Sequence, residues 1–280
     1  MAPGAGYIPN PVGHRAAPAR LLLGGSRAPA TWADLPSAVD LRPHFPAVMD
    51  QGQTSACVGH GTSAAIFASF SASGDPLPFV PSPLGIYTLA RAVTRAHDCP
   101  DGALPALADE GAIPADAIAG LSLYGVRPMG RQPDPRRYSD ADESTVADEP
   151  TLGDLELDAC ALVIGEHAVT SLSREARAFE VASLLACGTA LGFGMFVDRR
   201  YQAWRPHLPP IASTDESDPT GGGHWQALAG YERHTDGECV FRVRGSWGVG
   251  AGDRGDWLIT SAMLAACTDV TAIRAQRTTR

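Results

Sequence analysis

Residues 50–60 read DQGQTSACVGH and run directly into the apolar stretch Ala64–Ala68. This order predicts a loop that leads into a buried helix, from about Ser55 to Ser71, with Cys57 in its first turn. Amide groups at the start of a helix lack partners within the helix, and the helix dipole adds partial positive charge there. A thiolate is stabilised at such a position, so Cys57 is a candidate nucleophile. The alternative is that Cys57 is an ordinary small core residue, because free cysteine is often buried.

Gln51 lies six residues before Cys57. At this distance its side-chain amide can point to the same place as the backbone N–H of Cys57. Two donors aimed at one point form an oxyanion hole, which stabilises the negative charge that develops in acyl transfer. Cys57 and His60 also lie one helical turn apart, but two ligands are too few for a zinc site. We therefore expect acyl-transfer chemistry and no metal.

Length and composition limit the possible functions. The chain has 280 residues, 44% of them hydrophobic, which is enough for one large domain or two lobes that share a core. The net charge is −9 without a dense basic cluster, which argues against nucleic acid as a partner. Every basic residue is arginine, so no lysine is available as a base or Schiff-base nucleophile. No apolar run reaches about 18 residues, so we expect no membrane partner.

The cysteines are spaced widely and form no CxxC pair: Cys57, Cys99, Cys160, Cys187, Cys239 and Cys267. This pattern favours free thiols in a reducing compartment over a disulfide framework. The first residues also lack a charged segment followed by an apolar one, as a signal peptide would have. We therefore expect a cytoplasmic protein.

The chain is predicted to consist of an N-terminal arm, residues 1–34, and one domain, residues 35–280. The arm is rich in Gly, Pro, Ala and Arg and is too short to fold alone. A helical lobe is expected over about 55–125. Within it, Ser82 and Pro83 suit the start of a second helix, and a third is expected from Pro114 to Leu123.

The second half of the chain is predicted to be mainly sheet. Periodicity fails and acidic residues gather over about 128–158, which predicts a long loop, either a solvated insertion or a flap that faces substrate. A sheet lobe follows over about 159–270. It is expected to contain one helix, Ser173 to Ala186, and strands at residues 159–164, 190–197, 225–231, 239–244 and 256–260.

A nucleophilic cysteine needs a base that accepts its proton and stays beside it as imidazolium. Of the eight histidines, His224 has the most informative setting, because three glycines precede it and an apolar strand follows. A histidine in a sheet is also commonly a structural residue, so this setting alone leaves its role open. A third signal is the run Arg244–Gly248, which reads RGSWG.

These three blocks, Gln51–Cys57, the His224 strand and Ser246–Gly248, resemble in this order the active-site blocks of the papain-like cysteine peptidases. The resemblance spans most of residues 6–265 and is closest to bacterial members without a long inhibitory propeptide. It implies an α+β fold with a helical lobe, an antiparallel sheet or barrel lobe, and the active-site cleft between them. It also implies a peptide or protein substrate, possible binding of a protein partner or inhibitor, and no cofactor.

Carried over by position, the resemblance makes Cys57 the nucleophile and His224 the general base and then acid. Gln51 and the Cys57 N–H form the oxyanion hole, and Trp247 shields the histidine from water. Three departures stand out. Val58 and Thr54 replace an aromatic residue and a disulfide cysteine, and Gly245, just before Ser246, replaces the asparagine that normally orients the histidine.

No other core asparagine can take that role, because Asn10 is the only asparagine in the chain. His224 is then held by a water, a carbonyl or an acid such as Asp253, or it is held loosely. Loss of the orienting partner should lower the rate without abolishing the chemistry.

Three functions stay open. The first is a thiol hydrolase that cleaves peptide or isopeptide bonds. The second is a catalytically silent binding module that keeps the cleft, a reading that Gly245 motivates. The third is a peptide ligase or transpeptidase that uses the same residues. A dinucleotide loop at Gly250–Gly255, which matches GxGxxG, is rejected because a strand, and not a helix, is expected after it.

Overall fold

The computed structural model describes residues 6–23, 29–98, 109–129, 162–171 and 173–277. Nearly all of the predicted acidic loop lies outside these residues, as do Cys99 and Cys160. Among the described helices none is long and apolar enough to cross a membrane. The division into arm, lobes and loop at the stated boundaries stays a prediction.

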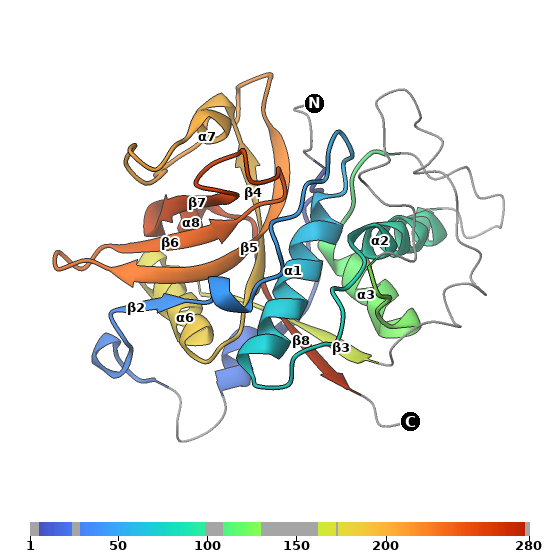
Figure 1. Cartoon of the computed structure of the whole chain (residues 1–280), viewed down its shortest axis with the longest axis horizontal. Coiled ribbons are helices and arrows are strands. Elements are labelled where there is room, and N and C mark those ends of the chain that lie inside the picture. The colour runs from blue at the N-terminus through green and yellow to red at the C-terminus, as the bar shows by residue number, and fades with distance from the viewer. Residues whose placement is uncertain (1–5, 24–28, 99–108, 130–161, 172, 278–280) are drawn as a thin grey trace.

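Three helices of the first half pack against one another on one side of the molecule (Figure 1). They are α1 (Cys57–Ala72), α2 (Pro83–Asp98) and α3 (Pro114–Tyr124). The Ser82 hydroxyl accepts a hydrogen bond from the N–H of Gly85 at 3.0 Å, and Pro83 is the first helical residue, as the sequence predicts. Helix α3 ends at Gly125, whose φ of 76° favours glycine.

The other side is an eight-stranded sheet in the order β1-β3-β8-β4-β5-β6-β7, with β2 paired to β5. All pairs are antiparallel except β1 with β3. The strands are β1 (Ala17–Pro18), β2 (Ala38–Asp40), β3 (Leu162–Ala168), β4 (Leu191–Val197), β5 (Gly222–Arg233), β6 (Cys239–Arg244), β7 (Asp256–Thr260) and β8 (Asp269–Arg277). The predicted α+β class is confirmed, and β6 and β7 have the predicted bounds.

Three further helices accompany the sheet: α6 (Arg174–Ala186), α7 (Arg199–Ala203) and α8 (Ser261–Ala266). The Ser173 side chain caps α6 by accepting from the N–H of Ala176 at 3.2 Å. Short 3-10 turns span Ala19–Leu23, Trp32–Asp34 and Arg42–His44. The sequence analysis did not anticipate α7, α8 or β8, and β5 is longer than expected because pairing with β4 begins at Gly222.

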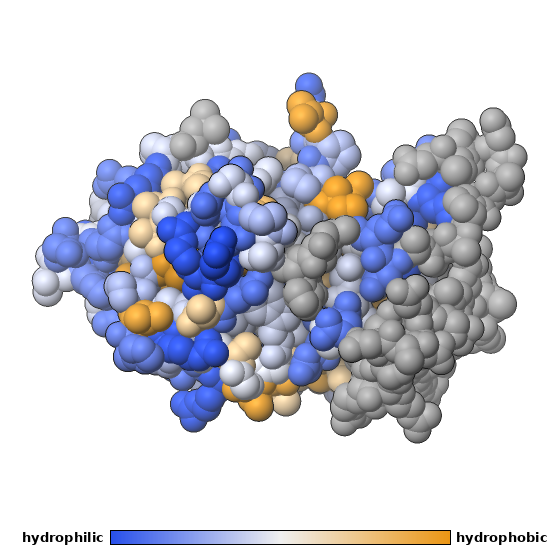
Figure 2. Space-filling model, turned by 90° about the horizontal axis from the view of Figure 1, so that it is seen from above, coloured by the Kyte–Doolittle hydropathy of each residue, from blue (hydrophilic) through white to orange (hydrophobic). Residues whose placement is uncertain are grey.

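Helix α1 packs directly on β5, and one indole fills the contact. Trp225 is 1% exposed. A Cβ added at Gly61 of α1 would lie 2.7 Å from the Trp225 ring, and one added at Gly192 of β4 would lie 2.3 Å from it. The two glycines therefore make room for the indole between helix and sheet. In the view of Figure 2, hydrophobic residues form only small separate patches on the described, mostly hydrophilic surface.

Substituting Gly61→Ala should lower the free energy of unfolding by about 1–3 kcal/mol, the usual cost of overpacking a filled core. Gly250→Ala is the matched control, because an added Cβ at Gly250 meets nothing within 4 Å. It should change stability by less than about 0.5 kcal/mol. Urea unfolding measures both, and equal stabilities of the two variants would contradict this account of the contact.

Candidate active site

Cys57 is the first residue of α1 and is fully buried. Its Sγ accepts a hydrogen bond from the backbone N–H of Trp225 at 3.5 Å. Trp225 follows His224 directly in β5, so the start of the helix meets the strand beside the predicted base. Cys57 and His224 are 167 positions apart in the sequence, and the contact between α1 and β5 brings their chain segments together.

The imidazole of His224 is fully buried and stacks on the indole of Trp247, with ring centroids 4.4 Å apart and planes inclined by 22°. Trp247 lies in the connection between β6 and β7, as the sequence placed it. The indole covers one face of the imidazole. The role of Trp247 as a shield against water stays a prediction, and this contact is compatible with it.

Gln51 is fully buried and its amide is held at both ends. Its Nε2 donates to the carbonyl of Thr54 at 2.7 Å, and its Oε1 accepts from the hydroxyl of Ser246. The backbone N–H of Gln51 also donates to the carbonyl of Ser246 at 2.8 Å. These bonds fix which amide atom faces which side, and they join Ser246 of the third block to Gln51 of the first.

Gly245 has no room for a side chain. A Cβ there would lie 2.4 Å from the Trp257 ring, and its N–H donates to the carbonyl of Gly255 at 3.0 Å. Asp253, one candidate for holding His224, lies instead beside two arginines, 3.8 Å from Arg242 and 3.9 Å from Arg254. Trp257 therefore occupies the space where the resemblance places an asparagine.

An aromatic cluster surrounds this space. Tyr201 of α7 stacks on Trp257, with centroids 5.4 Å apart, and Trp247 stands edge-on to both rings at 6.1 and 5.5 Å. The Trp257 Nε1–H donates to the carbonyl of Tyr201 at 3.1 Å. The sequence analysis missed Tyr201 and gave Trp257 no role, because no motif links α7 to β7. Four of the five tryptophans lie in the second half of the chain, and this was the only available signal.

Gly245→Asn, although it restores the residue that the resemblance calls for, should impair the protein. Overpacking against Trp257 should cost about 1–3 kcal/mol of stability. We expect slower modification of the Cys57 thiol as well, because Trp257 must move and Trp247 packs on it. Thermal unfolding and thiol-labelling rates measure the two effects. Faster labelling at unchanged stability would show that the space is open to an asparagine.

Residues 6–10 of the N-terminal arm cross this site. The backbone N–H of Gly6 acts on the Cys57 thiol, whose pKa it lowers against the effect of burial. The N–H of Tyr7 donates to the carbonyl of Gly223, at 3.0 Å, from the sheet side. On the helical side, Ala112 donates to the Gly6 carbonyl at 2.8 Å and accepts from the Ile8 N–H at 3.0 Å. The arm thus bridges both walls of the site.

Asp269, the first residue of β8, anchors the arm. It accepts hydrogen bonds from the Tyr7 hydroxyl, from the Asn10 backbone N–H at 3.1 Å and from the Asn10 side-chain amide at 3.2 Å. The Asn10 Oδ1 in turn accepts from the N–H of Ala115 at 3.0 Å, at the start of α3. The only asparagine in the chain therefore fastens the arm and does not orient the histidine.

Burial decides the protonation state of the Cys57 thiol. Burial raises the pKa of Cys57 to about 12, while backbone N–H groups of Trp225 and Gly6 oppose that rise. Position at a helix start predicted a stabilised thiolate, but in this closed form desolvation outweighs the amide groups. At neutral pH the thiol is therefore protonated in this structure.

His60 is a structural residue of α1. It is buried, and its Nδ1 lies 2.9 Å from the carbonyl of Ala56. Burial lowers the pKa of His60 to about 4, so the ring is neutral at neutral pH. The glycine-rich run at Gly250–Gly255 leads into strand β7, so the reason for rejecting a dinucleotide loop is confirmed.

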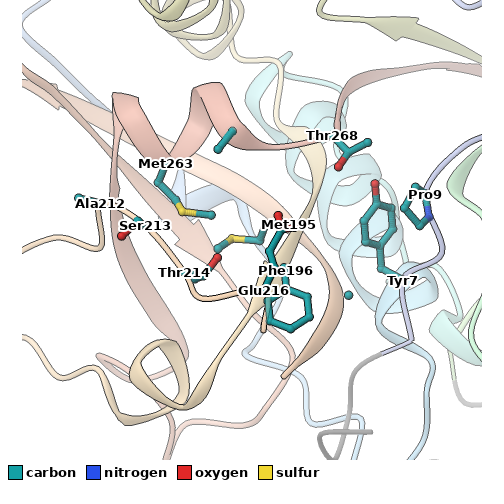
Figure 3. Close-up of a pocket in the computed structure, with 12 residues that line it drawn as sticks. Tyr7, Pro9, Met195, Phe196, Ala212, Ser213, Thr214, Glu216, Met263 and Thr268 are labelled. Atoms are coloured by element: carbon teal, nitrogen blue, oxygen red, sulfur yellow. The ribbon is translucent and has the colours of Figure 1, made fainter. Parts of the chain in front are cut away.

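A cavity of about 370 Å³ opens beside Gly223, next to His224 (Figure 3). Met195, Phe196 and Met263 give it apolar walls, and residues 212–216 form a polar edge on which Glu216 carries a charge. Tyr7 and Pro9 of the arm line the opposite side, as Figure 3 shows. The cavity can accept an apolar side chain from a chain that lies in the place of the arm.

The fold is that of the papain-like cysteine proteases. It is similar to xylellain, a cysteine protease from Xylella fastidiosa (TM-score 0.68, 24% identity, 99% of this chain and 97% of that one). It is also similar to a procathepsin B from Trypanosoma congolense (TM-score 0.69, 15% identity, 98% of this chain and 87% of that one). Bromelain from Ananas comosus is similar as well (TM-score 0.57, 15% identity, 87% of this chain and 100% of that one). The chain matches no known family description and no curated protein sequence.

Proposed function

We propose that this chain is a cysteine peptidase that hydrolyses peptide or isopeptide bonds through an acyl-enzyme on Cys57. One observation carries the proposal. The Cys57 sulfur, at the start of α1, accepts a hydrogen bond from the backbone of Trp225, the residue next to His224. The Gln51 amide is fixed in the segment that leads into α1, by Thr54 and Ser246. The cysteine proteases among its structural neighbours support this chemistry.

In the proposed reaction His224 accepts the thiol proton and the Cys57 sulfur attacks the substrate carbonyl carbon. The oxygen becomes negatively charged and is stabilised by the Cys57 N–H and by Gln51 Nε2. The C–N bond then breaks as His224 gives its proton to the leaving amine. Water, deprotonated by His224, hydrolyses the thioester and regenerates the thiol.

The groups that hold the arm also suit a substrate. The carbonyl of Gly223 and both backbone groups of Ala112 bond to the arm as a strand partner would. An extended peptide can use these groups once the arm leaves, with one side chain in the cavity bordered by Met195 and Met263. The proposed enzyme therefore acts only after its own arm has moved.

An epoxide-type thiol reagent should label Cys57, and His224→Ala should slow the labelling by about 10²- to 10⁴-fold, the usual contribution of a general base. Mass spectrometry after digestion identifies the labelled residue. Cys57→Ala controls for other sites. Cys187→Ala is the matched control, because Cys187 is an exposed free thiol at the end of α6 and has no role in the proposed reaction. This variant should leave Cys57 labelling unchanged.

Absence of labelling at Cys57 even when Tyr7→Ala loosens the arm, or equal labelling after His224→Ala, would overturn the proposal. Two alternatives share the site. A silent binding module, which Gly245 and the occupied cleft favour, predicts no turnover of a broad peptide library and a stable bound partner. A peptide ligase predicts Cys57-dependent products in which an added amine replaces water.

Release of the arm should activate the thiol. Tyr7→Ala removes the ring and the hydroxyl that bonds to Asp269, and should raise the labelling rate of Cys57 by about tenfold, since one hydrogen bond contributes about 1 kcal/mol and the ring adds packing. Val12→Ala is the control within the arm, because Val12 is fully exposed. Equal rates for the two variants and the unsubstituted chain would show that the arm does not limit access.

A further inference from the structure

We propose that Asp269 selects substrates that carry an arginine side chain, and that this side chain enters the slot now filled by Tyr7 of the arm. This inference rests on the proposed function. Tyr7 is 6% exposed, and its backbone N–H donates to the carbonyl of Gly223 at 3.0 Å. An extended peptide that bonds to the same carbonyl places one of its own side chains where the Tyr7 ring lies.

The slot is built on a row of three residues that crosses three neighbouring strands. Trp225 of β5 lies opposite Gly194 of β4, and Gly194 lies opposite Asp269 of β8. Directly opposite residues in an antiparallel pair share one face of the sheet. The row therefore runs from an indole through a position without a side chain to a carboxylate.

The Tyr7 ring lies along this row. Its centroid is 5.7 Å from that of the Trp225 ring, and a Cβ added at Gly194 would lie 2.1 Å from it. Its hydroxyl donates a hydrogen bond to Asp269. The slot thus has an aromatic wall, a flat floor and an acceptor at its end, and it already holds a flat side chain that ends in a donor.

The arm supplies every hydrogen-bond donor that the described residues offer to the Asp269 carboxylate. Besides the Tyr7 hydroxyl, these are the backbone N–H of Asn10 at 3.1 Å and its side-chain amide at 3.2 Å. None of the ion pairs in the described part of the chain includes this half-buried carboxylate. When the arm leaves, Asp269 loses three donors at once, and a charge in such a place needs new ones.

An arginine side chain meets this need better than a tyrosine. Tyrosine brings one donor and no charge, and in the arm Asn10 adds the other two donors. A substrate side chain enters the slot without Asn10. The guanidinium group is flat, always charged and able to bind both oxygens of a carboxylate, and it can also stack on an indole such as Trp225.

The cavity of about 370 Å³ beside Tyr7 adds room and a second negative charge. Figure 3 shows the Tyr7 hydroxyl pointing toward Thr268, the residue before Asp269, with the cavity next to the ring. Met195 and Met263 can contact the methylene groups of a long side chain. Glu216 is the one charged residue among the described residues that line the cavity, so its charge also favours a cation.

The test uses peptide epoxides that differ in one residue, which is arginine, citrulline, tyrosine or leucine. Citrulline has the shape of arginine without its charge. The variable residue is placed in turn at each of the three positions next to the epoxide, and mass spectrometry gives the rate of Cys57 labelling. The protein is the full chain with Tyr7→Ala, which empties the slot. At one position the arginine peptide should label at least about tenfold faster than the other three, because it gains a charge-assisted hydrogen bond.

Asp269→Asn, added to this chain, should slow labelling by the arginine peptide about 10- to 100-fold and leave the leucine peptide nearly unchanged. Asn10→Ala is the matched control, because it also removes a contact of the arm but keeps the carboxylate, so the arginine preference should remain. Glu216→Gln should reduce the preference less than Asp269→Asn does, because Glu216 is exposed and exposed charges interact weakly.

Three results would overturn the inference and leave the proposed function standing: equal labelling by the arginine and citrulline peptides at every position, faster labelling by the tyrosine peptide, or a preference that survives Asp269→Asn. Should Asp269→Asn fail to fold, Glu216→Gln decides. A preference that it abolishes counts against Asp269, and one that persists supports Asp269, the acidic side chain then left at the slot. Absence of Cys57 labelling by every peptide would overturn the proposed function and this inference with it.

Discussion

The contact between the start of α1 and the middle of β5 is the constraint on which the site depends. The Trp225 N–H donates a hydrogen bond to the Cys57 sulfur, and the Trp225 side chain fills the space between Gly61 of α1 and Gly192 of β4. One residue therefore joins helix and sheet through its side chain and meets the nucleophile through its backbone. Because side chains alternate along a strand, the same placement sends His224 to the opposite face, against Trp247.

Much of this could be predicted from the sequence, because its signals are local. Residues 50–60 predict a loop and a helix with Cys57 at its start, and Ser82, Pro83 and Gly125 mark helix ends by their own chemistry. The strands β6 and β7 follow from short apolar runs. The papain-like fold follows from the order of three blocks, and the structure confirms it.

The rest depends on long-range geometry that no local pattern encodes. The residues of β5 and β6 that face each other are set by a register that shifts between Leu228 and Gly230. Tyr201 comes from a five-residue helix that the sequence did not reveal, and its ring reaches Trp257 across 56 positions. The thiolate expected for Cys57 is not favoured in this structure, because distant segments meet around the sulfur and bury it, which raises its pKa.

The path of the arm has a consequence for how this sequence can vary. A Cβ added at Gly111 would lie 2.3 Å from the carbonyl oxygen of Gly6, and one added at Gly223 would lie 2.3 Å from that of Tyr7. A Cβ added at Gly194 would lie 2.1 Å from the Tyr7 ring. Gly6 itself leaves 2.0 Å to the carbonyl of Ser55. These glycines line the path of the protein's own N-terminal segment and leave no space there for a further side chain. An alanine at any one of them would press on the segment or on its neighbour first, so we expect the segment and these glycines to vary together among related chains.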